Sequence, residues 1–383
     1  MYYNKGSTGF SDKPKGILSK YEHVTSIYKN GTKKLITLTP YEPYTNNFGS
    51  DEMVFKLPRQ GSGILTNAYI HSGSAMSQIV NTKTFDGLGF NLFRNTIFET
   101  ESRTTKIQEY SNDNLALWIN ELPIEPQNYY ISVASQTYSP TGITPIQGRM
   151  VTPLGYLNIF QPDVAPLDLR YVEQLQFRLQ TNSINEMETQ TTYVDDTDPE
   201  NPVTLSNRSS LTSLETKITI EVWIPEDTGE VIGHRSYLLY DNYNERNVLY
   251  PDGAPSVSTD LKCRREITKI NGFIQEIRTD GTVRSLYSIS NLSFKLGNLV
   301  LFDENYQSFN IFNQHFKDDS ANFRYYTGYL KDKGTDSGKL KIAESIPNLT
   351  IQANVGADSN LKILLEYPYV LHIDKDGKVS REF

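Results

Sequence analysis

Two stretches of strict two-residue alternation constrain the fold more than any other feature of this sequence. In Gln174–Gln180, Leu175, Phe177 and Leu179 alternate with polar residues, and in Lys217–Ile224 β-branched aliphatic residues take every second position. Successive side chains of a β-strand point to opposite faces, so both stretches are predicted to be half-buried strands. A chain built on such strands is expected to form antiparallel sheets that pack through one face.

Further strands are expected along the whole chain, several of them beside turn signals. The dipeptides Asn30–Gly31 and Asp280–Gly281 favour tight hairpin turns. The expected strands are His23–Lys29, Thr32–Thr39, Met53–Leu57, Ile64–Ile70, Leu88–Phe93, Asn128–Ser135, Tyr156–Phe160, Ile267–Thr279, Val283–Ser290, Leu292–Leu296, Asn298–Phe302, Leu349–Val355, Leu361–Leu365 and Tyr369–Ile373, which turns through Asp376–Gly377. Leu292–Leu296 and Asn298–Phe302 are interpreted as one kinked strand or as two.

Two short helices interrupt this pattern. One lies in Phe85–Leu122, where Leu115, Trp118, Ile119 and Leu122 recur at helical spacing after a possible N-cap at Asp113. The second is Glu304–Phe316, which spaces its phenylalanines similarly. Because each helix follows a strand, we expect Trp118 and Phe312 to be buried at comparable places in two equivalent halves.

The length and composition indicate two β-domains. The chain has 383 residues, of which only 21% are charged, and its acidic, Ser/Thr-rich segment 183–213 has almost no apolar pattern. We predict an all-β protein of two tandem eight-stranded jelly-roll barrels with short helices. The predicted division is an N-terminal arm (1–30), a first jelly roll (31–182), a linker or surface loop (183–214) and a second jelly roll with a C-terminal tail (215–383). One sandwich with a large insertion is the alternative.

The charge and cysteine content exclude several classes of function. The net charge is −8 and no run of basic residues occurs, so direct binding to nucleic acid is not expected. The only cysteine, Cys263, excludes an internal disulfide and a cysteine-based zinc site, and it fits folding in a reducing compartment. The first residues contain no apolar segment of a classical signal peptide.

No constellation in the sequence indicates catalysis, and we therefore predict no enzyme. The histidines lack metal-ligand spacing, and the acidic groups at 195–200 and at Asp374 and Asp376 fit a solvated loop and a hairpin turn better than a calcium site. The predicted site contains no catalytic residue, no cofactor-binding residue and no metal ligand. The histidines are His23, His71, His234, His315 and His372. The 25 tyrosines indicate packing between sheets and subunits rather than a platform for sugars.

Several short segments together resemble a known family. They are Phe55–Arg59, Ile64–Ile70, Gly87–Phe93 and Leu115–Trp118, which follow one another in the first half of the chain. Their order resembles the double jelly-roll major capsid proteins of tailless icosahedral viruses, the lineage of adenovirus hexon and of several membrane-containing phages. The long inserted loops of hexon are absent, so the resemblance is to a compact member of the phage kind.

The resemblance implies a structural virion protein. Such a protein forms pseudo-hexagonal homotrimers that assemble into an icosahedral shell. Its partners would be neighbouring capsomers, minor capsid or vertex proteins and an internal lipid membrane, without direct contact to nucleic acid. It would fold in the host cytoplasm and reside in the virion. The alternatives are a vertex or spike protein that binds a receptor or carbohydrate, and a jelly-roll hydrolase, which would need two facing carboxylates.

Overall fold

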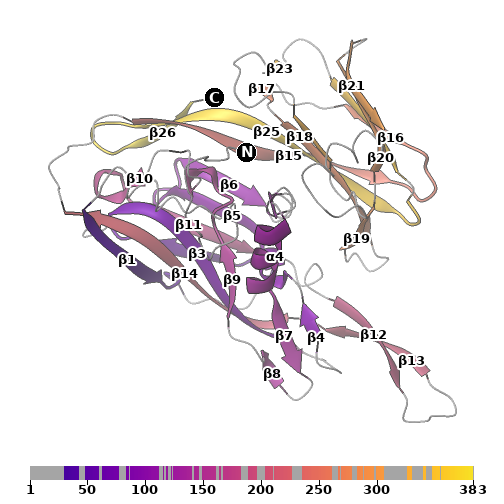
Figure 1. The fold of residues 1–383 in the computed structure, drawn as a ribbon, viewed down its shortest axis with the longest axis horizontal. Coiled ribbons are helices and arrows are strands. Elements are labelled where there is room, and N and C mark those ends of the chain that lie inside the picture. Colours follow the sequence, from indigo (N-terminus) through magenta and orange to yellow (C-terminus); the bar gives the residue numbers. More distant parts are fainter. Residues whose placement is uncertain are drawn as a thin grey trace.

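The computed structural model describes most of the chain (Figure 1). The described residues are 30–42, 48–59, 63–76, 83–85, 87–111, 115, 118–119, 122, 124–139, 142–145, 149–160, 164, 167–182, 189–195, 203–209, 211–226, 235–260, 266–267, 269–277, 283–287, 289–296, 299–305, 326–329, 340–341, 347–353 and 355–382.

The first barrel consists of two antiparallel sheets. One contains β1 (Gly31–Leu38), β14 (Leu211–Pro225) and β3 (Ile64–Met76) in this order, with β10 (Leu167–Asp168) and β9 (Met150–Pro153) beside β3. The other has the order β2 (Glu52–Lys56), β11 (Leu175–Thr181), β5 (Phe93–Thr100) and β6 (Lys106–Ser111). The alternation predicted for Gln174–Gln180 is confirmed, because Leu175, Phe177 and Leu179 are buried in β11. Phe177 stacks on Phe98 of β5, with ring centroids 4.7 Å apart.

The second barrel repeats this arrangement. Its first sheet has the order β15 (Arg235–Tyr250), β25 (Ser359–Ile373), β18 (Lys269–Ile277) and β19 (Val283–Tyr287), with β22 (Tyr326–Tyr329) on β18 and β26 (Val379–Glu382) on β25. Its second sheet has the order β16 (Val257–Asp260), β24 (Pro347–Ala353), β20 (Ile289–Leu296) and β21 (Leu299–Asn305). β18 and β19 pair antiparallel, but the tight turn expected at Asp280–Gly281 lies outside the described residues. The pairing of β20 with β21 shows that Leu292–Phe302 forms two strands.

The two barrels share one strand order. In each, the first strand pairs with the last, and the last pairs with a strand from the first half: β1-β14-β3 corresponds to β15-β25-β18. In each, the other sheet ends in a hairpin: β2-β11-β5-β6 corresponds to β16-β24-β20-β21. This is the eight-stranded jelly roll, present twice. The all-β prediction of two tandem jelly rolls with short helices is therefore confirmed, and a single sandwich with an insertion is wrong.

Smaller elements lie around these sheets. They are the sheet of β4 (Lys83–Phe85), β7 (Gln136–Ser139) and β8 (Gly142–Pro145), the pair β12 (Thr189–Asp195) and β13 (Val203–Ser209), the pair β17 (Glu266–Ile267) and β23 (Leu340–Lys341), the helices α2 (Leu88–Asn91) and α4 (Ile124–Val133), and the 3-10 turns η1 (Asn158–Phe160) and η2 (Leu169–Tyr171). The β12–β13 hairpin projects away from the first barrel in Figure 1.

The placement of the long strand after segment 183–213 was predicted wrongly. β14 pairs with β1 from Gly31 to Leu38 and with β3 along most of its length. It therefore completes the first barrel and does not open the second. The acidic segment forms the β12–β13 hairpin between two strands of one barrel, so it is a surface loop and not a linker. Composition marked the insertion correctly, but strand pairing decides to which barrel the next strand belongs.

Three short strands were predicted where the chain is helical. Asn128–Ser135 lies mainly in α4, where Pro126, Tyr130 and Ala134 are buried at intervals of four residues. The amide of Ala134 bonds to the carbonyl of Tyr130 at 3.1 Å. The β-propensity of this Tyr- and Ile-containing segment is overridden because one helical face packs on the barrel.

The other two are short turns of helix. Leu88–Phe93 begins as α2, because Gly87 with a φ of 66° turns the chain before Leu88. A short apolar run does not distinguish a buried strand from a buried helix by its period. Tyr156–Phe160 contains η1, in which the amide of Phe160 bonds to the carbonyl of Leu157 at 2.9 Å.

The turn predicted at Asn30–Gly31 is also wrong. Gly31 is the first residue of β1 and pairs with Pro225, and neither Asn30 nor Gly31 is among the described residues with positive φ. The strand expected at His23–Lys29 lies outside the described residues. Of the predicted helix Glu304–Phe316, Glu304 and Asn305 belong to β21, and Phe312 lies outside the described residues.

The helix predicted around Trp118 is supported at the residues that are described. Leu115, Trp118 and Ile119 are helical. Trp118 is half-buried and packs against the core, 5.3 Å from the ring of Tyr130 and 6.0 Å from that of Tyr156.

Candidate interface between the two barrels

The histidines do not form a catalytic or metal site in the described part of the chain. His71 is half-buried, and burial lowers its pKa, with the nearby Arg149 charge adding to the effect. Nδ1 of His372 lies 2.9 Å from the hydroxyl of Ser236, and its Nε2 lies 3.0 Å from a carboxylate oxygen of Glu382. His23, His234 and His315 lie outside the described residues, as does Cys263. Among described residues, no group of three or more His, Cys, Asp or Glu could hold a metal ion.

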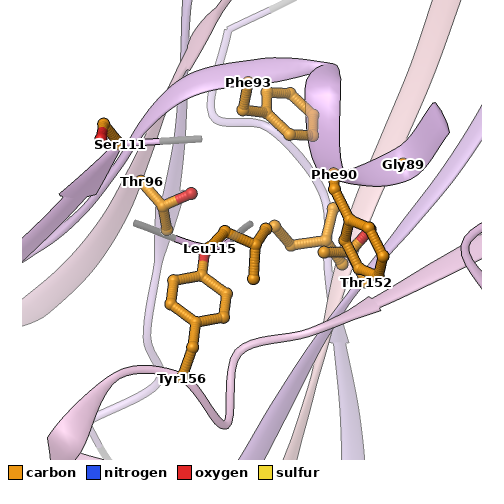
Figure 2. A pocket seen from close by; sticks show the side chains of 9 residues that line it. Gly89, Phe90, Phe93, Thr96, Ser111, Leu115, Thr152 and Tyr156 are labelled. Atoms are coloured by element: carbon orange, nitrogen blue, oxygen red, sulfur yellow. The ribbon is translucent and has the colours of Figure 1, made fainter. Parts of the chain in front are cut away.

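A small pocket at one end of the first barrel lacks the groups that catalysis needs (Figure 2). It is lined by Ile70, Gly89, Phe90, Phe93, Thr96, Ser111, Leu115, Thr152 and Tyr156. Its polar atoms are hydroxyl groups. Burial raises the pKa of Tyr156, although a hydrogen bond with Thr96 opposes this, so the phenol stays protonated. The pocket offers no carboxylate or imidazole for proton transfer at neutral pH.

Other tyrosines are also held in packed positions. Burial raises the pKa of Tyr138 to about 12, and burial together with the Glu221 charge raises that of Tyr69 to about 12. Tyr367 and Tyr369, two candidates for an aromatic platform, are buried in β25. This agrees with tyrosine as a packing residue in this fold.

Two acidic residues on the outer face of the β2-β11-β5 sheet are bound to one arginine. The guanidinium of Arg178 donates to both carboxylate oxygens of Glu99, at 2.8 and 2.9 Å, and to Glu52 at 2.9 Å. The side-chain amide of Gln176 adds a bond of 2.9 Å to Glu99, which is only 1% exposed. The hydrogen bonds with Glu99 raise the pKa of Arg178. Carboxylates satisfied in this way stabilise the sheet and are not poised as a hydrolase pair.

Residues of both barrels meet at a junction. β18 pairs only with Ser359–Glu366 of β25. The later part of β25 and the start of β15, which pair with each other, extend beyond β18. Tyr237, Leu239, Tyr369 and Leu371 on this extension are buried in one apolar cluster with the first barrel. In Figure 1 the extension crosses above β6.

Polar contacts fix this extension to the start of β6. The hydroxyl of Tyr369 donates to the carbonyl oxygen of Ile107. Arg381 on β26 lies over the Tyr369 ring, 3.8 Å from its centroid, and donates to the carbonyl of Lys106 at 3.1 Å. Because β6 is the last strand of its sheet, its outward carbonyls would otherwise face solvent. The second barrel thus covers an edge of the first.

The hairpin between β25 and β26 forms a second contact. Asp374 Oδ1 accepts hydrogen bonds from the amides of Asp376 and Lys378, both at 2.9 Å, so the Asp374 carboxylate stabilises a hairpin turn, as expected. Gly377 has a φ of 80°, and its carbonyl accepts a bond of 2.8 Å from the amide of Glu173. A Cβ at position 377 would lie 2.6 Å from the carbonyl oxygen of Tyr171. The turn therefore requires glycine for both its conformation and its close approach to the first barrel.

The sides of this turn are fixed as well. The Glu173 side chain accepts a bond of 2.6 Å from the amide of Val379, and the Thr105 hydroxyl donates to the carbonyl of Val379 at 3.2 Å. We call the segment Asp374–Glu382 the C-terminal clasp. The clasp and the apolar cluster together hold the two barrels in one relative orientation.

No sequence pattern predicted this junction. It joins Tyr369 to Ile107, which are 262 positions apart. The alternation in Tyr369–Ile373 indicated which side chains share a face, but not that the first barrel covers that face.

Comparison with known proteins supports the fold. No family model matches the chain, and no curated protein matches it. Among solved structures, it is similar to VP54 of the virus PBCV-1, at 11% identity and a TM-score of 0.65 over 92% of this chain and 97% of that chain. The major capsid protein of mavirus gives 11% identity and a TM-score of 0.56 over 91% of this chain and 90% of the other. The major capsid protein of Faustovirus gives 9% and 0.55 over 88% and 90%.

At these identities the likeness establishes the fold, which is the double jelly roll that viral capsid proteins adopt. It extends across both barrels. Among the described residues, no helix is long and apolar enough to cross a membrane.

Proposed function

We propose that this chain is a structural protein of a virion, a major capsid protein that assembles as pseudo-hexagonal homotrimers into an icosahedral shell. One observation carries the proposal: two jelly rolls of the same strand order are held side by side by the C-terminal clasp and by one apolar cluster. Three such chains supply six similar barrels, the number that a hexagonal tile requires. The solved structures of similar fold include major capsid proteins.

The division of the chain follows from this proposal and from the strand pairing. We infer an arm before β1, a first jelly roll that ends with β14, and a second that runs from β15 to the clasp. The β12–β13 hairpin then belongs to the first jelly roll as a surface loop.

The partners are part of the same proposal. Trimers would contact neighbouring capsomers and minor capsid or vertex proteins, with a lipid membrane beneath the shell. The net charge of −8 argues against direct contact with the genome. The chain would fold in the host cytoplasm and function in the virion without enzymatic activity. The bacteriophage assignment stays a prediction, since the similar structures above come from PBCV-1, mavirus and Faustovirus.

The alternative of a vertex or spike protein predicts a single jelly roll, so the second barrel favours a capsomer. Negative-stain electron microscopy of the purified full-length chain tests the choice. Particles with three-fold symmetry and six lobes, or hexagonal arrays of them, are expected for the major capsid protein. Single-lobed monomers or five-fold rings would overturn the proposal.

A further inference from the structure

Strand β26, which forms the second half of the C-terminal clasp, is an addition to the jelly roll. In the first barrel, β3 pairs with β14 as far as Trp223. In the second barrel, β18 pairs with β25 only as far as Glu366, and β26 takes the same edge of β25 from Val370 to Ile373. Both barrels keep their shared strand order without β26. The clasp can therefore leave its place without removing a strand of either jelly roll.

The clasp is held by hydrogen bonds more than by apolar burial. Among its residues, only Val379 has a buried side chain. On the first barrel, the amide of Glu173 donates to the carbonyl of Gly377, and the carboxylate of Glu173 accepts from the amide of Val379. Thr105 donates to the carbonyl of Val379. Segments that bury little apolar surface open at a lower free energy than core strands. The clasp is thus an element that can open before the barrels unfold.

The clasp also contributes what apolar contact at the junction cannot, a defined direction. Leu239 is fully buried there, but apolar burial depends on area and has no preferred direction. Hydrogen bonds require a narrow range of distance and angle. Those to Glu173 and Thr105 therefore fix how one barrel is oriented on the other. Arg381 of the clasp also covers the ring of Tyr369, whose hydroxyl donates to the first barrel. An open clasp would leave the barrels in contact without one fixed orientation.

We propose that the C-terminal clasp opens and closes while both barrels stay folded, and that only a chain with a closed clasp joins a trimer. This inference rests on the proposed trimer and assigns the step that regulates its formation. A symmetric tile of three chains requires the same relation between the two barrels of every chain. A chain with an open clasp lacks that relation, so it cannot present both barrels to its neighbours at once.

Hydrogen exchange of the full-length wild type, followed by mass spectrometry, tests whether the clasp opens separately. The amides of Lys378 and Val379 are hydrogen-bonded in the closed clasp, so their exchange reports its opening. The amides of β14, which pairs with β1 and β3, report unfolding of the first barrel. We expect the clasp to exchange about a hundredfold or more faster than β14. Equal rates would show that the clasp opens only when the chain unfolds, and would overturn the proposal.

Two matched pairs of substitutions open the clasp on purpose. In Gly377→Ala the added Cβ meets the carbonyl oxygen of Tyr171, whereas in Gly253→Ala it meets no atom within 4 Å. Asp374→Ala removes the carboxylate that accepts two amides of the turn, whereas Asp376 supplies its backbone amide, which Asp376→Ala retains. We expect the first variant of each pair to speed exchange in the clasp by about tenfold or more, and the second to leave it within about threefold of wild type. Circular dichroism verifies that all four variants fold.

Sedimentation velocity over a concentration series then measures the assembly of the same variants. If about one chain in ten is closed, the concentration at which half of the trimers dissociate rises about thirtyfold, because three closed chains must meet. Unchanged association of a variant whose clasp is open would overturn the proposal, as would equal weakening by both members of a pair. A monomeric wild type would instead refute the proposed trimer, and the exchange rates would still decide whether the clasp opens separately.

Discussion

The two barrels have the same strand order but use their first strands differently. The start of β15 is covered by the first barrel of the same chain, and its residue Leu239 is fully buried between the barrels. β1 carries Leu35 on an exposed strand. The face of β1 that corresponds to Leu239 carries Ile36 and Leu38, which pack on the core of their own barrel, and Leu35 lies on the opposite face. The first strand thus covers its own core in the first barrel, whereas in the second barrel it also forms the junction with the other barrel.

The largest expected effect on stability comes from shortening a buried leucine on the first strand of the second barrel, with an exposed leucine on the first strand of the first barrel as the control. Leu239→Ala removes a side chain that is 0% exposed and is expected to lower the free energy of unfolding by about 2–5 kcal/mol. Leu35→Ala removes an exposed side chain and should change it by less than about 0.5 kcal/mol. Denaturant titration measures both. Similar losses in the two variants would show that burial of Leu239 at the junction does not stabilise the chain.

Two spectroscopic signals can show which barrel loses stability in the Leu239→Ala variant. Both tryptophans, Trp118 and Trp223, belong to the first barrel. Tryptophan fluorescence therefore follows the first barrel, while far-ultraviolet circular dichroism follows both. If the junction couples the barrels, Leu239→Ala shifts both transitions although Leu239 lies in the second barrel. A shift in circular dichroism alone would show that the barrels unfold independently.

A smaller effect is expected at the turn of the clasp. Gly377→Ala forces a Cβ to within 2.6 Å of a backbone oxygen at a φ of 80°. The matched control is Gly253→Ala, where φ is 69° and no atom lies within 4 Å of the added Cβ. In both variants an alanine must adopt a left-handed conformation, which should lower the free energy of unfolding by about 1 kcal/mol. The close contact in Gly377→Ala should lower it further by about 1–3 kcal/mol, the cost of local backbone strain. Thermal unfolding followed by fluorescence compares them, and equal shifts would mean that the clasp does not bear on the first barrel.

The smallest expected effect is the pH dependence of Glu52. Burial acts to raise its pKa, but hydrogen bonds from Gln180 and Arg178 outweigh this and lower it. A carboxyl with a lowered pKa in the folded state stabilises the protein above its ordinary pKa of about 4.3, and that stability is lost as the pH falls through the folded value.

Glu52→Gln should therefore cost less than about 1 kcal/mol at pH 7, because Glu52 is largely solvent-screened. The difference from wild type should shrink below about pH 4. Urea titrations at several pH values measure it. A difference that is constant down to pH 3 would show that the charge of Glu52 does not contribute to the first barrel.

Much of the fold was predictable where one face of a strand is buried. The alternation of Leu175, Phe177 and Leu179 identified β11, since water on one side and core on the other produce that pattern. Tyr130 illustrates the limit, because it lies in a segment of high β-propensity that is helical through packing on the barrel. Propensity and period describe a segment by itself and do not register what covers it.

The junction could not be predicted from the sequence, for the same reason. Arg381, Tyr369 and Lys106 meet only when the two barrels lie side by side. The sequence correctly indicated the turn at Asp374–Gly377, because Asp and Gly specify it locally. That the turn holds one barrel to the other is determined by Glu173 and Tyr171, which are distant in the chain.

The central claim is that two jelly rolls, held in one relative orientation, make a unit of a three-fold tile. Native mass spectrometry of the purified full-length chain tests it most directly. The account predicts a dominant species of three times the 43.6 kDa chain mass. A wild-type protein that remains a monomer of 43.6 kDa at micromolar concentration, or that forms a five-fold ring, would contradict it.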